Sequence, residues 1–332
     1  MWQQYLADYP DHAVVATILH IIEFGASLGH IGPEFEQACH NLKSAFEQPQ
    51  VVADYIHSLH ALSHAKGLFP LPPLPYFRCS PLGTVLPTRK TKAHVINHLS
   101  WPDHTYSIPD FEGTIIYECF ERAIDTLREY GQGSLLAKLN LKDAYHHIPV
   151  QPQDWHLQGC HLNGQFFFFS VLIFGEKMAP YIFNLFAEAL HWIIQWHIPV
   201  AIQHYLNYFL PIFSSSTLLH IADAAVTWIQ ELGAQLGLQF QECKTVCPCL
   251  ALEFLGLELD SLRMEARLPM LKLCFLCELL MTWGGQKCTC SLHKLQELVG
   301  FLQFTLQVIP ASRTFIHRLI DFSMSFTCQF TK

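Results

Sequence analysis

Positive charge is scarce in this sequence: its 332 residues include 20 lysines and arginines against 28 aspartates and glutamates, a formal net charge of -8. Contacts with phosphate groups supply most of the non-specific affinity of a protein for nucleic acid. We therefore expect any nucleic-acid binding to be weak or confined to a local patch. The 20 histidines can restore positive charge only below about pH 6, because the unperturbed pKa of histidine is about 6.5.

The sequence also lacks an uninterrupted hydrophobic run. Glu188 is the only formally charged residue between Ala179 and Phe213, but Pro199 breaks this run, and a bilayer span needs about 20 mostly apolar residues. Residues 1–10 carry charge and have no apolar core, so they do not resemble a signal peptide. We expect a cytoplasmic or nuclear protein with no signal peptide, no transmembrane segment and reduced thiols.

The 12 cysteines are scattered along the chain. Cys274-x-x-Cys277 and Cys288-x-Cys290 could together supply four zinc ligands. However, the first pair lies within a helical pattern, and the second pair does not have the spacing of a zinc knuckle. We favour buried or incidental thiols over a zinc site.

The hydrophobic content of 51% excludes a disordered chain, and the length suits one large domain or two to three lobes. Residues 13–24 and 51–65 have apolar residues at helical spacing and predict two helices that pack or bind a partner. Residues 68–75, with the sequence LFPLPPLP, cannot form a regular helix or a central strand. We therefore predict three regions: a helical extension over 1–70, a central region over 71–260, and a helical region over 261–332.

Two stretches about sixty residues apart each carry a polar group at the end of an apolar strand. Leu135–Leu141 predicts a strand that delivers Asn140. Val200–Leu206 and Phe209–Phe213 predict a hairpin with Asn207 and Tyr208 at its tip. Such strand ends are typical of an active-site wall.

These two stretches resemble motifs A and C of reverse transcriptases, in particular those of tyrosine-recombinase-type, fungal-like retrotransposons. Motif A reads Asp-x-x-x-Ala-Tyr, and residues 140–145 read NLKDAY. Motif C reads Tyr-x-Asp-Asp, and residues 205–208 read YLNY. The positions of the family's metal-binding aspartates are therefore occupied by Asn140, Asn207 and Tyr208.

Four more motifs follow in the family's order, so the resemblance extends from about Arg78 to the end of the sequence. They are a basic fingers hairpin (78–102), motif B (FGEKMAPYIFN, 174–184), motif D (LGLQFQECKT, 236–245) and the hairpin that holds the primer end (LEFLGLELD, 252–260). Three helices predicted after residue 268 would form the thumb. The implied fold is α+β: a polymerase right hand of fingers, palm and thumb, with a ferredoxin-like antiparallel palm sheet and a helical N-terminal extension.

The resemblance also implies roles for side chains that contact a nucleoside triphosphate. Arg89, Lys90 and His94 correspond to residues near its phosphates, although a neutral imidazole at 94 cannot replace a bidentate guanidinium. Tyr145 corresponds to the residue beneath the sugar, Phe174 and Gly175 to the loop beneath the templating base pair, and Lys244 to a lysine that assists pyrophosphate departure. Judged without the resemblance, Arg89 and Lys90 form a solvated turn and Lys244 is a surface lysine.

Polymerisation in this family uses two Mg²⁺ ions about 4 Å apart, and Mg²⁺ prefers carboxylate oxygen. An amide offers only a neutral carbonyl, and a phenol stays protonated up to a pH of about 10. We therefore expect no cofactor and no catalysis here. The alternative is that the motif register is shifted and that Asp143 or Asp154 serves instead.

The hypothesis that follows is a catalytically inactive reverse transcriptase-like domain from a decayed retrotransposon reading frame. His94, Asn140 and Asn207 each differ from the family residue by a change that one cytosine-to-thymine transition on one strand would make, but Tyr208 does not. Active relatives bind an RNA or DNA primer–template, and we expect this partner to bind weakly or not at all here. The alternative function is a non-catalytic scaffold that binds nucleic acid or protein.

Overall fold

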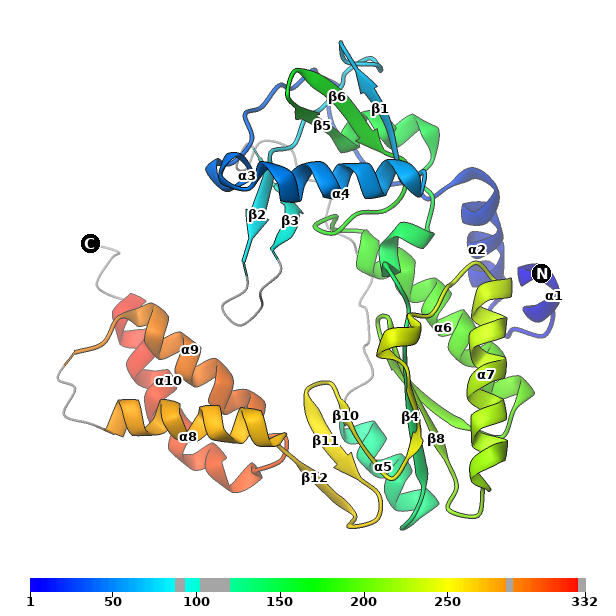
Figure 1. Cartoon of the computed structure of the whole chain (residues 1–332), viewed down its shortest axis with the longest axis vertical. Helices are drawn as coiled ribbons and strands as arrows, with labels where there is room; N and C mark the ends of the chain where they lie inside the picture. Colours follow the sequence, from blue (N-terminus) through cyan, green and yellow to red (C-terminus); the bar gives the residue numbers. More distant parts are fainter. Residues whose placement is uncertain (87–92, 102–119, 285–288, 328–332) are drawn as a thin grey trace. The chain divides into compact units, whose positions relative to one another are not determined.

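The computed structural model describes residues 1–86, 93–101, 120–284 and 289–327, and its chain divides into two compact units (Figure 1). The first unit comprises Met1–Tyr117, Leu141–His197 and Gln230–Gln241. The second comprises Glu118–Asn140, Ile198–Ile229 and Glu242–Lys332. Each unit is therefore assembled from segments that are far apart in the sequence. None of the helices in the described part of the chain has the length and apolar character needed to cross a bilayer.

Four helices begin the first unit: α1 (Trp2–Tyr5), α2 (His12–Phe24), α3 (Lys43–Glu47) and α4 (Pro49–Ala61). Asp11 caps α2, since its carboxylate accepts hydrogen bonds from the backbone N–H groups of Ala13 and Val14 at 2.9 and 3.1 Å. Gly25 follows the helix with a φ of +88°, which glycine adopts without strain. The two N-terminal helices expected from the sequence are present as α2 and α4, but α4 ends at Ala61 rather than at residue 65, where β1 begins.

The beginning of the chain is anchored to distant segments of the same unit. The indole N–H of Trp2 donates a hydrogen bond to the carbonyl of Leu236 at 2.9 Å, just after helix α7 (Leu219–Gln235). The Trp2 ring also meets Phe186 of helix α6 (Ala179–His197) edge to face, with centroids 5.5 Å apart. These contacts give the N-terminal extension a packing role.

Two small antiparallel sheets complete the first unit. One has the strand order β1-β6-β5, and β2 pairs with β3 in the other. The strands are β1 (Ala65–Phe69), β2 (Leu82–Val85), β3 (His94–Asn97), β5 (Gly159–Leu162) and β6 (Gln165–Phe169), with the short 3₁₀ helices η1 (Ala144–His147) and η2 (Pro152–Gln158) before β5. β6 ends at Phe169, although the apolar run of the sequence continues, and residues 170–173 are buried outside any named strand.

The second unit contains a four-stranded antiparallel sheet in the order β7-β8-β4-β9 (Figure 1). Its strands are β4 (Leu135–Asn140), β7 (Ala201–Tyr205), β8 (Tyr208–Phe213) and β9 (Val246–Cys249). Helix α5 (Phe120–Tyr130) packs its Phe120 and Leu127 against Leu210 and Ile212 of this sheet. The buried apolar side chains of α5 and the sheet fix the position of the strand ends.

A hairpin extension and three helices follow this sheet in the second unit. Strands β10 (Ala251–Phe254), β11 (Leu257–Asp260) and β12 (Glu265–Arg267) form an antiparallel sheet. The helices are α8 (Met270–Gly284), α9 (Leu292–Thr305) and α10 (Arg313–Thr327), with the 3₁₀ turn η4 (Pro310–Ser312) before α10. All three helices expected after residue 268 are therefore present, and α9 packs on α10 through Leu295, Val299 and Ile316.

Candidate functional site

Asn140, Asn207 and Tyr208 come together at one end of the four-stranded sheet. Asn140 is the last residue of β4 and pairs with Tyr208, the first residue of β8. The β7–β8 hairpin closes on the Tyr205–Tyr208 pair, so its two-residue turn is Leu206–Asn207. The expected tip at 207–208 is therefore wrong by one residue, and Leu206 takes the left-handed conformation with a φ of 52°.

The two asparagines at this sheet end bind each other. The Asn207 side-chain amide donates a hydrogen bond from Nδ2 to Oδ1 of Asn140 at 3.3 Å. Asn140 is only 2% exposed, and its own Nδ2 is buried with no hydrogen-bond partner among the described residues. A buried donor without a partner costs about 1–3 kcal/mol, so this arrangement is not optimised for stability.

These residues do not fit a pair of magnesium ions. Mg²⁺ is a hard cation that binds anionic oxygen, whereas Oδ1 of Asn140 is neutral and already accepts the Asn207 N–H group. The unpaired Nδ2 of Asn140 is a donor and cannot act as a ligand. No aspartate or glutamate occurs in β4, β7, β8 or β9.

The two aspartates considered as replacements both belong to the first unit. The Asp154 carboxylate accepts hydrogen bonds from the Leu28 backbone N–H at 2.6 Å and from Gln151 Nε2 at 2.9 Å, so it holds a loop in place. Asp143 precedes η1 in a left-handed conformation with a φ of 52°. Its side chain makes no cap hydrogen bond, and its backbone carbonyl accepts from the His146 N–H at 2.8 Å.

Lys244 lies in the second unit on the 3₁₀ turn η3 (Glu242–Lys244). This turn leads into β9, whose Val246 pairs with Lys138 of β4, and η3 itself contacts β4. The Lys244 side chain is exposed. The fold therefore places this lysine beside the strand that ends at Asn140.

Within the first unit, the structure brings together three of the residues expected to contact a nucleotide. The ring of Tyr145 is buried and lies 4.7 Å from that of Phe174, which is 57% exposed. Gly175 follows with a φ of +99°, and a Cβ atom there would lie 3.3 Å from Cδ1 of Leu99. A larger residue at 175 would therefore strain the backbone and crowd Leu99.

The basic residues expected in the fingers hairpin are placed only in part. His94 is exposed at the start of β3, where it pairs with Val85 of β2. Arg89 and Lys90 lie outside the described residues.

The first cysteine pair, Cys274 and Cys277, lies in helix α8, which confirms the helical setting expected for it. Both thiols are free and exposed. Cys288 of the second pair lies outside the described residues.

A family model for reverse transcriptase (RNA-dependent DNA polymerase) matches residues 87–259, more than half of the chain. The chain belongs to the reverse transcriptase family. This match contains the strand ends that carry Asn140, Asn207 and Tyr208. Among curated proteins, none matches the sequence.

Two solved structures of foamy viral reverse transcriptases share this fold. One is the foamy viral protease–reverse transcriptase dRH in complex with double-stranded DNA, with a TM-score of 0.62 and 12% identity over 91% of this chain. The other is the foamy viral protease–reverse transcriptase in complex with double-stranded DNA, with a TM-score of 0.60 and 13% identity over 91% of this chain. This chain spans 51% and 61% of their respective lengths. The similarity confirms the α+β polymerase fold expected from the sequence.

Glu176 is a buried acid of this reverse transcriptase-family chain that the sequence did not single out. It lies directly after Gly175 and is 6% exposed, and its Oε2 has no hydrogen-bond partner among the described residues. Burial, with a smaller contribution from Asp154, raises the pKa of Glu176 to about 8. The carboxyl group is therefore mostly protonated at neutral pH. The sequence signal that could have identified Glu176 is its position beside Gly175 in the motif B loop.

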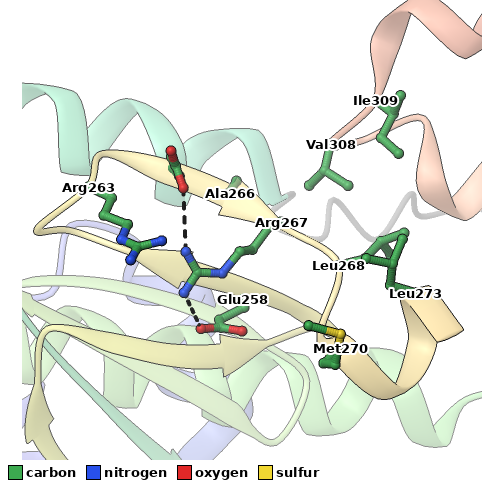
Figure 2. A pocket seen from close by; sticks show the side chains of 10 residues that line it. Glu258, Arg263, Ala266, Arg267, Leu268, Met270, Leu273, Val308 and Ile309 are labelled. Carbon is green, nitrogen blue, oxygen red and sulfur yellow. Dashed lines mark hydrogen bonds and ion pairs between the residues drawn. The ribbon is translucent and has the colours of Figure 1, made fainter.

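Charged side chains of the second unit concentrate on the hairpin that resembles the family's primer-holding element. Arg267 of β12 forms ion pairs with Glu258 at 2.7 Å, Asp260 at 3.1 Å and Glu265 at 3.4 Å. Figure 2 shows Arg267 between two carboxylates, one of them that of Glu258. Arg267, Glu258 and Glu265 line a cavity of about 580 Å³ together with apolar side chains. Those apolar residues are Leu268, Met270, Leu273, Val308 and Ile309.

Proposed function

We propose that this reverse transcriptase-family chain does not catalyse nucleotidyl transfer. The observation that supports this proposal is the hydrogen bond from the Asn207 amide to Oδ1 of Asn140 at 3.3 Å. The family resemblance places metal-binding carboxylates at these two positions. In this chain a neutral amide pair is present instead, and the third position is the phenol of Tyr208.

The expected loss of activity is large because each substitution removes a negative charge from the same small site. Losing one group that stabilises the transition state electrostatically costs about 3–4 kcal/mol, or about 10²–10³ in rate. With three such groups replaced, polymerisation should fall by many powers of ten. The strands of this sheet offer no replacement, because β4, β7, β8 and β9 contain no aspartate or glutamate.

Primer extension on an RNA or DNA template with Mg²⁺ or Mn²⁺ tests the proposal. We expect no extension by the unmodified chain and extension by the triple variant Asn140→Asp, Asn207→Asp, Tyr208→Asp. A further variant that adds His94→Arg tests whether the fingers position also limits the rate. Extension by the unmodified chain would overturn the proposal.

A control separates the effect of site geometry from that of negative charge added elsewhere. Asn163→Asp with Gln165→Glu adds two carboxylates, against three in the triple variant, at exposed residues of the β5–β6 hairpin. We expect this control to be as inactive as the unmodified chain. Circular dichroism of every variant establishes that each one is folded before its activity is compared.

The second candidate function is a non-catalytic scaffold that binds primer–template. The ion pairs of Arg267 and the packing of α5 on the sheet support it, because both stabilise the polymerase fold without needing metal ligands. A mobility shift on primer–template at two salt concentrations measures this binding. With a net charge of -8 we expect a weak shift that disappears as salt is raised, and no shift at low salt would exclude this function.

We also infer that the chain derives from a retrotransposon of the tyrosine-recombinase type. The order of the six motifs supports this origin, as do His94, Asn140 and Asn207, each of which is one transition away from the family residue. Sequencing the neighbouring genomic DNA tests the inference. Remnants of a tyrosine recombinase reading frame are expected, and the reading frames of another retroelement class would contradict this origin.

A further inference from the structure

His64 and His146 form an imidazole pair in the first unit that the proposed function does not use. His64 lies between α4 and β1, and His146 lies in η1. Their ring centroids are 5.2 Å apart, and the rings are tilted by 54°. Although the two residues are 82 positions apart in the sequence, the fold brings their rings into contact.

Each ring of this pair has one buried nitrogen without a hydrogen-bond partner among the residues that the structure describes: Nδ1 of His64 and Nε2 of His146. Buried polar atoms almost always have a partner, and an exception calls for a bound water, an ion or a functional role. Other histidines also have such atoms, but His64 and His146 are the pair whose rings lie in contact beside a cavity.

The backbone holds both histidines in place. The N–H of His64 donates to the Leu59 carbonyl at 2.9 Å, and the carbonyl of His64 accepts from the Ser170 N–H at 2.9 Å. The N–H of His146 donates to the Asp143 carbonyl at 2.8 Å, and Phe174 contacts the His146 ring edge to face at 6.0 Å. The pair is therefore positioned before any ligand binds.

A cavity of about 320 Å³ lies beside the pair. It is lined by both histidines together with Lys142, Asp143 and His147, and the side chains of Lys142 and Asp143 are exposed. The cavity is therefore open to solvent, while the two unpartnered nitrogens themselves are buried beside it. The cavity is large enough to hold an ion with several of its water ligands.

His147 lines the same cavity but has no free nitrogen. Its Nδ1 contacts the Ala144 carbonyl at 3.1 Å, and its Nε2 accepts a hydrogen bond from the Gln239 backbone N–H at 3.3 Å. These two contacts fix the tautomer with the proton on Nδ1. His147 is therefore a structural residue and a natural control for its neighbour His146.

We propose that His64 and His146 together bind one divalent transition-metal ion, such as Zn²⁺ or Cu²⁺, with water from the cavity completing its coordination. Zn–N bonds of about 2.0–2.1 Å in a tetrahedral site place two imidazole centres about 5 Å apart, close to the observed 5.2 Å. Imidazole suits zinc and copper, whereas magnesium prefers oxygen. The site is therefore chemically distinct from the family's magnesium site.

The charges around the pair act in both directions. The negative charge of Asp143 acts on both rings and attracts a cation to the cavity, whereas Lys142 on the cavity wall repels it. The net electrostatic contribution is therefore small, and the imidazole nitrogens provide the affinity.

Calorimetric titration of the full chain with Zn²⁺ at pH 7 tests the proposal. We compare the unmodified chain with the double variant His64→Gln, His146→Gln and expect the double variant to bind one ion fewer, with at least a tenfold loss of affinity at that site. His147→Gln, which changes the same cavity, should retain this ion. His12→Gln with His40→Gln, both exposed, measures adventitious binding by surface histidines.

Electron paramagnetic resonance with one equivalent of Cu²⁺ identifies the ligands independently. Nitrogen hyperfine structure should be present in the unmodified chain and in His147→Gln and should change in the single variant His64→Gln, which keeps the more buried His146. If the double variant, or His64→Gln alone where the double variant does not fold, binds as many ions with the same affinity as the unmodified chain, the proposal is wrong. Polymerase activity enters neither measurement, so the outcome is independent of the function proposed above.

Discussion

The end of the four-stranded sheet and the β10–β12 hairpin belong to the same unit but differ in their charges. At the sheet end, Asn140 and Asn207 are neutral and bind each other. On the hairpin, Glu258, Asp260 and Glu265 surround Arg267 at 2.7 to 3.4 Å. Acidic residues are thus present on the hairpin, where an arginine of the chain provides the positive charge. They are absent at the sheet end, where a metal ion would have to provide it.

This difference indicates which requirements the sequence still meets. The hairpin carboxylates stabilise the folded chain directly, because their positive partner is a side chain. Carboxylates at the sheet end would repel each other unless a cation bound between them. The hairpin therefore has the charges that stabilise its fold, and the end of the four-stranded sheet lacks the carboxylates that a pair of magnesium ions would need.

The largest expected effect comes from restoring the carboxylates at the sheet end. Asn140→Asp with Asn207→Asp puts two negative charges at the 3.3 Å contact, one of them on a buried residue. We expect the free energy of unfolding to fall by about 3 kcal/mol without divalent metal and to recover in millimolar Mn²⁺. Chemical denaturation with and without Mn²⁺ measures both changes.

The exposed pair Asn163→Asp with Gln165→Glu is the control for that experiment. We expect its stability to stay within about 0.5 kcal/mol of the unmodified chain and to show no response to Mn²⁺. A double variant at 140 and 207 that is as stable as this control would contradict the like-charge argument.

A smaller effect is expected on the hairpin. Asp260 is 7% exposed and accepts hydrogen bonds or ion pairs from the Arg263 N–H at 2.9 Å and from Arg267 at 3.1 Å. Asp260→Asn should lower the free energy of unfolding by about 1–2 kcal/mol, because hydrogen bonds to a charged group are lost or weakened. Glu265→Gln, whose side chain is 56% exposed, should lower the free energy of unfolding by less than about 0.5 kcal/mol. Equal losses in the two variants would contradict the expectation that the buried carboxylate contributes more.

The stability difference caused by Asp260 should depend on pH. The Arg263 backbone N–H and the Arg267 guanidinium hold the pKa of Asp260 below its ordinary value. A carboxylate with a lowered folded-state pKa stabilises the protein above its unfolded pKa of about 3.9, and this contribution disappears as pH falls through the folded-state pKa. The gap between the unmodified chain and Asp260→Asn should thus be constant from pH 7 to about 5 and shrink below about 4. A stability difference that widens in acid would contradict the lowered pKa of Asp260.

The smallest effect is expected at Lys244. Its side chain is exposed, so Lys244→Ala should change the free energy of unfolding by less than about 0.5 kcal/mol. In the triple variant of residues 140, 207 and 208, the same substitution should slow primer extension if Lys244 acts on the departing pyrophosphate. Unchanged extension in that background would leave Lys244 as an ordinary surface lysine.

Much of the fold could be predicted because local signals mark its elements. The β10–β11 hairpin follows from LEFLGLELD, where Leu255 and Gly256 take positive φ values of 47° and 82° at the turn. The end of β6 could not be predicted, since the apolar run that contains Phe166–Phe169 continues to Ile173 with no polar residue except Ser170. The buried residues after the strand are as apolar as those within it, so composition does not mark where the strand ends.

The candidate site was predictable only at the level of residue positions. The family resemblance identified Asn140 and Asn207, but their hydrogen bond joins residues 67 positions apart and depends on the register of β4 with β8. The turn was misplaced by one residue, because Leu206 is not a residue type that favours a left-handed φ. The contact between His64 and His146 had no sequence signal at all.

The hydrogen bond from Trp2 to Leu236 constrains the order in which this chain can fold during synthesis. The first unit includes Gln230–Gln241, so the ribosome must release this segment before that unit can close. Until then the N-terminal helices have apolar surfaces without their final neighbours. Nascent chains truncated before residue 230 should therefore bind chaperones that no longer bind to chains extending past residue 241.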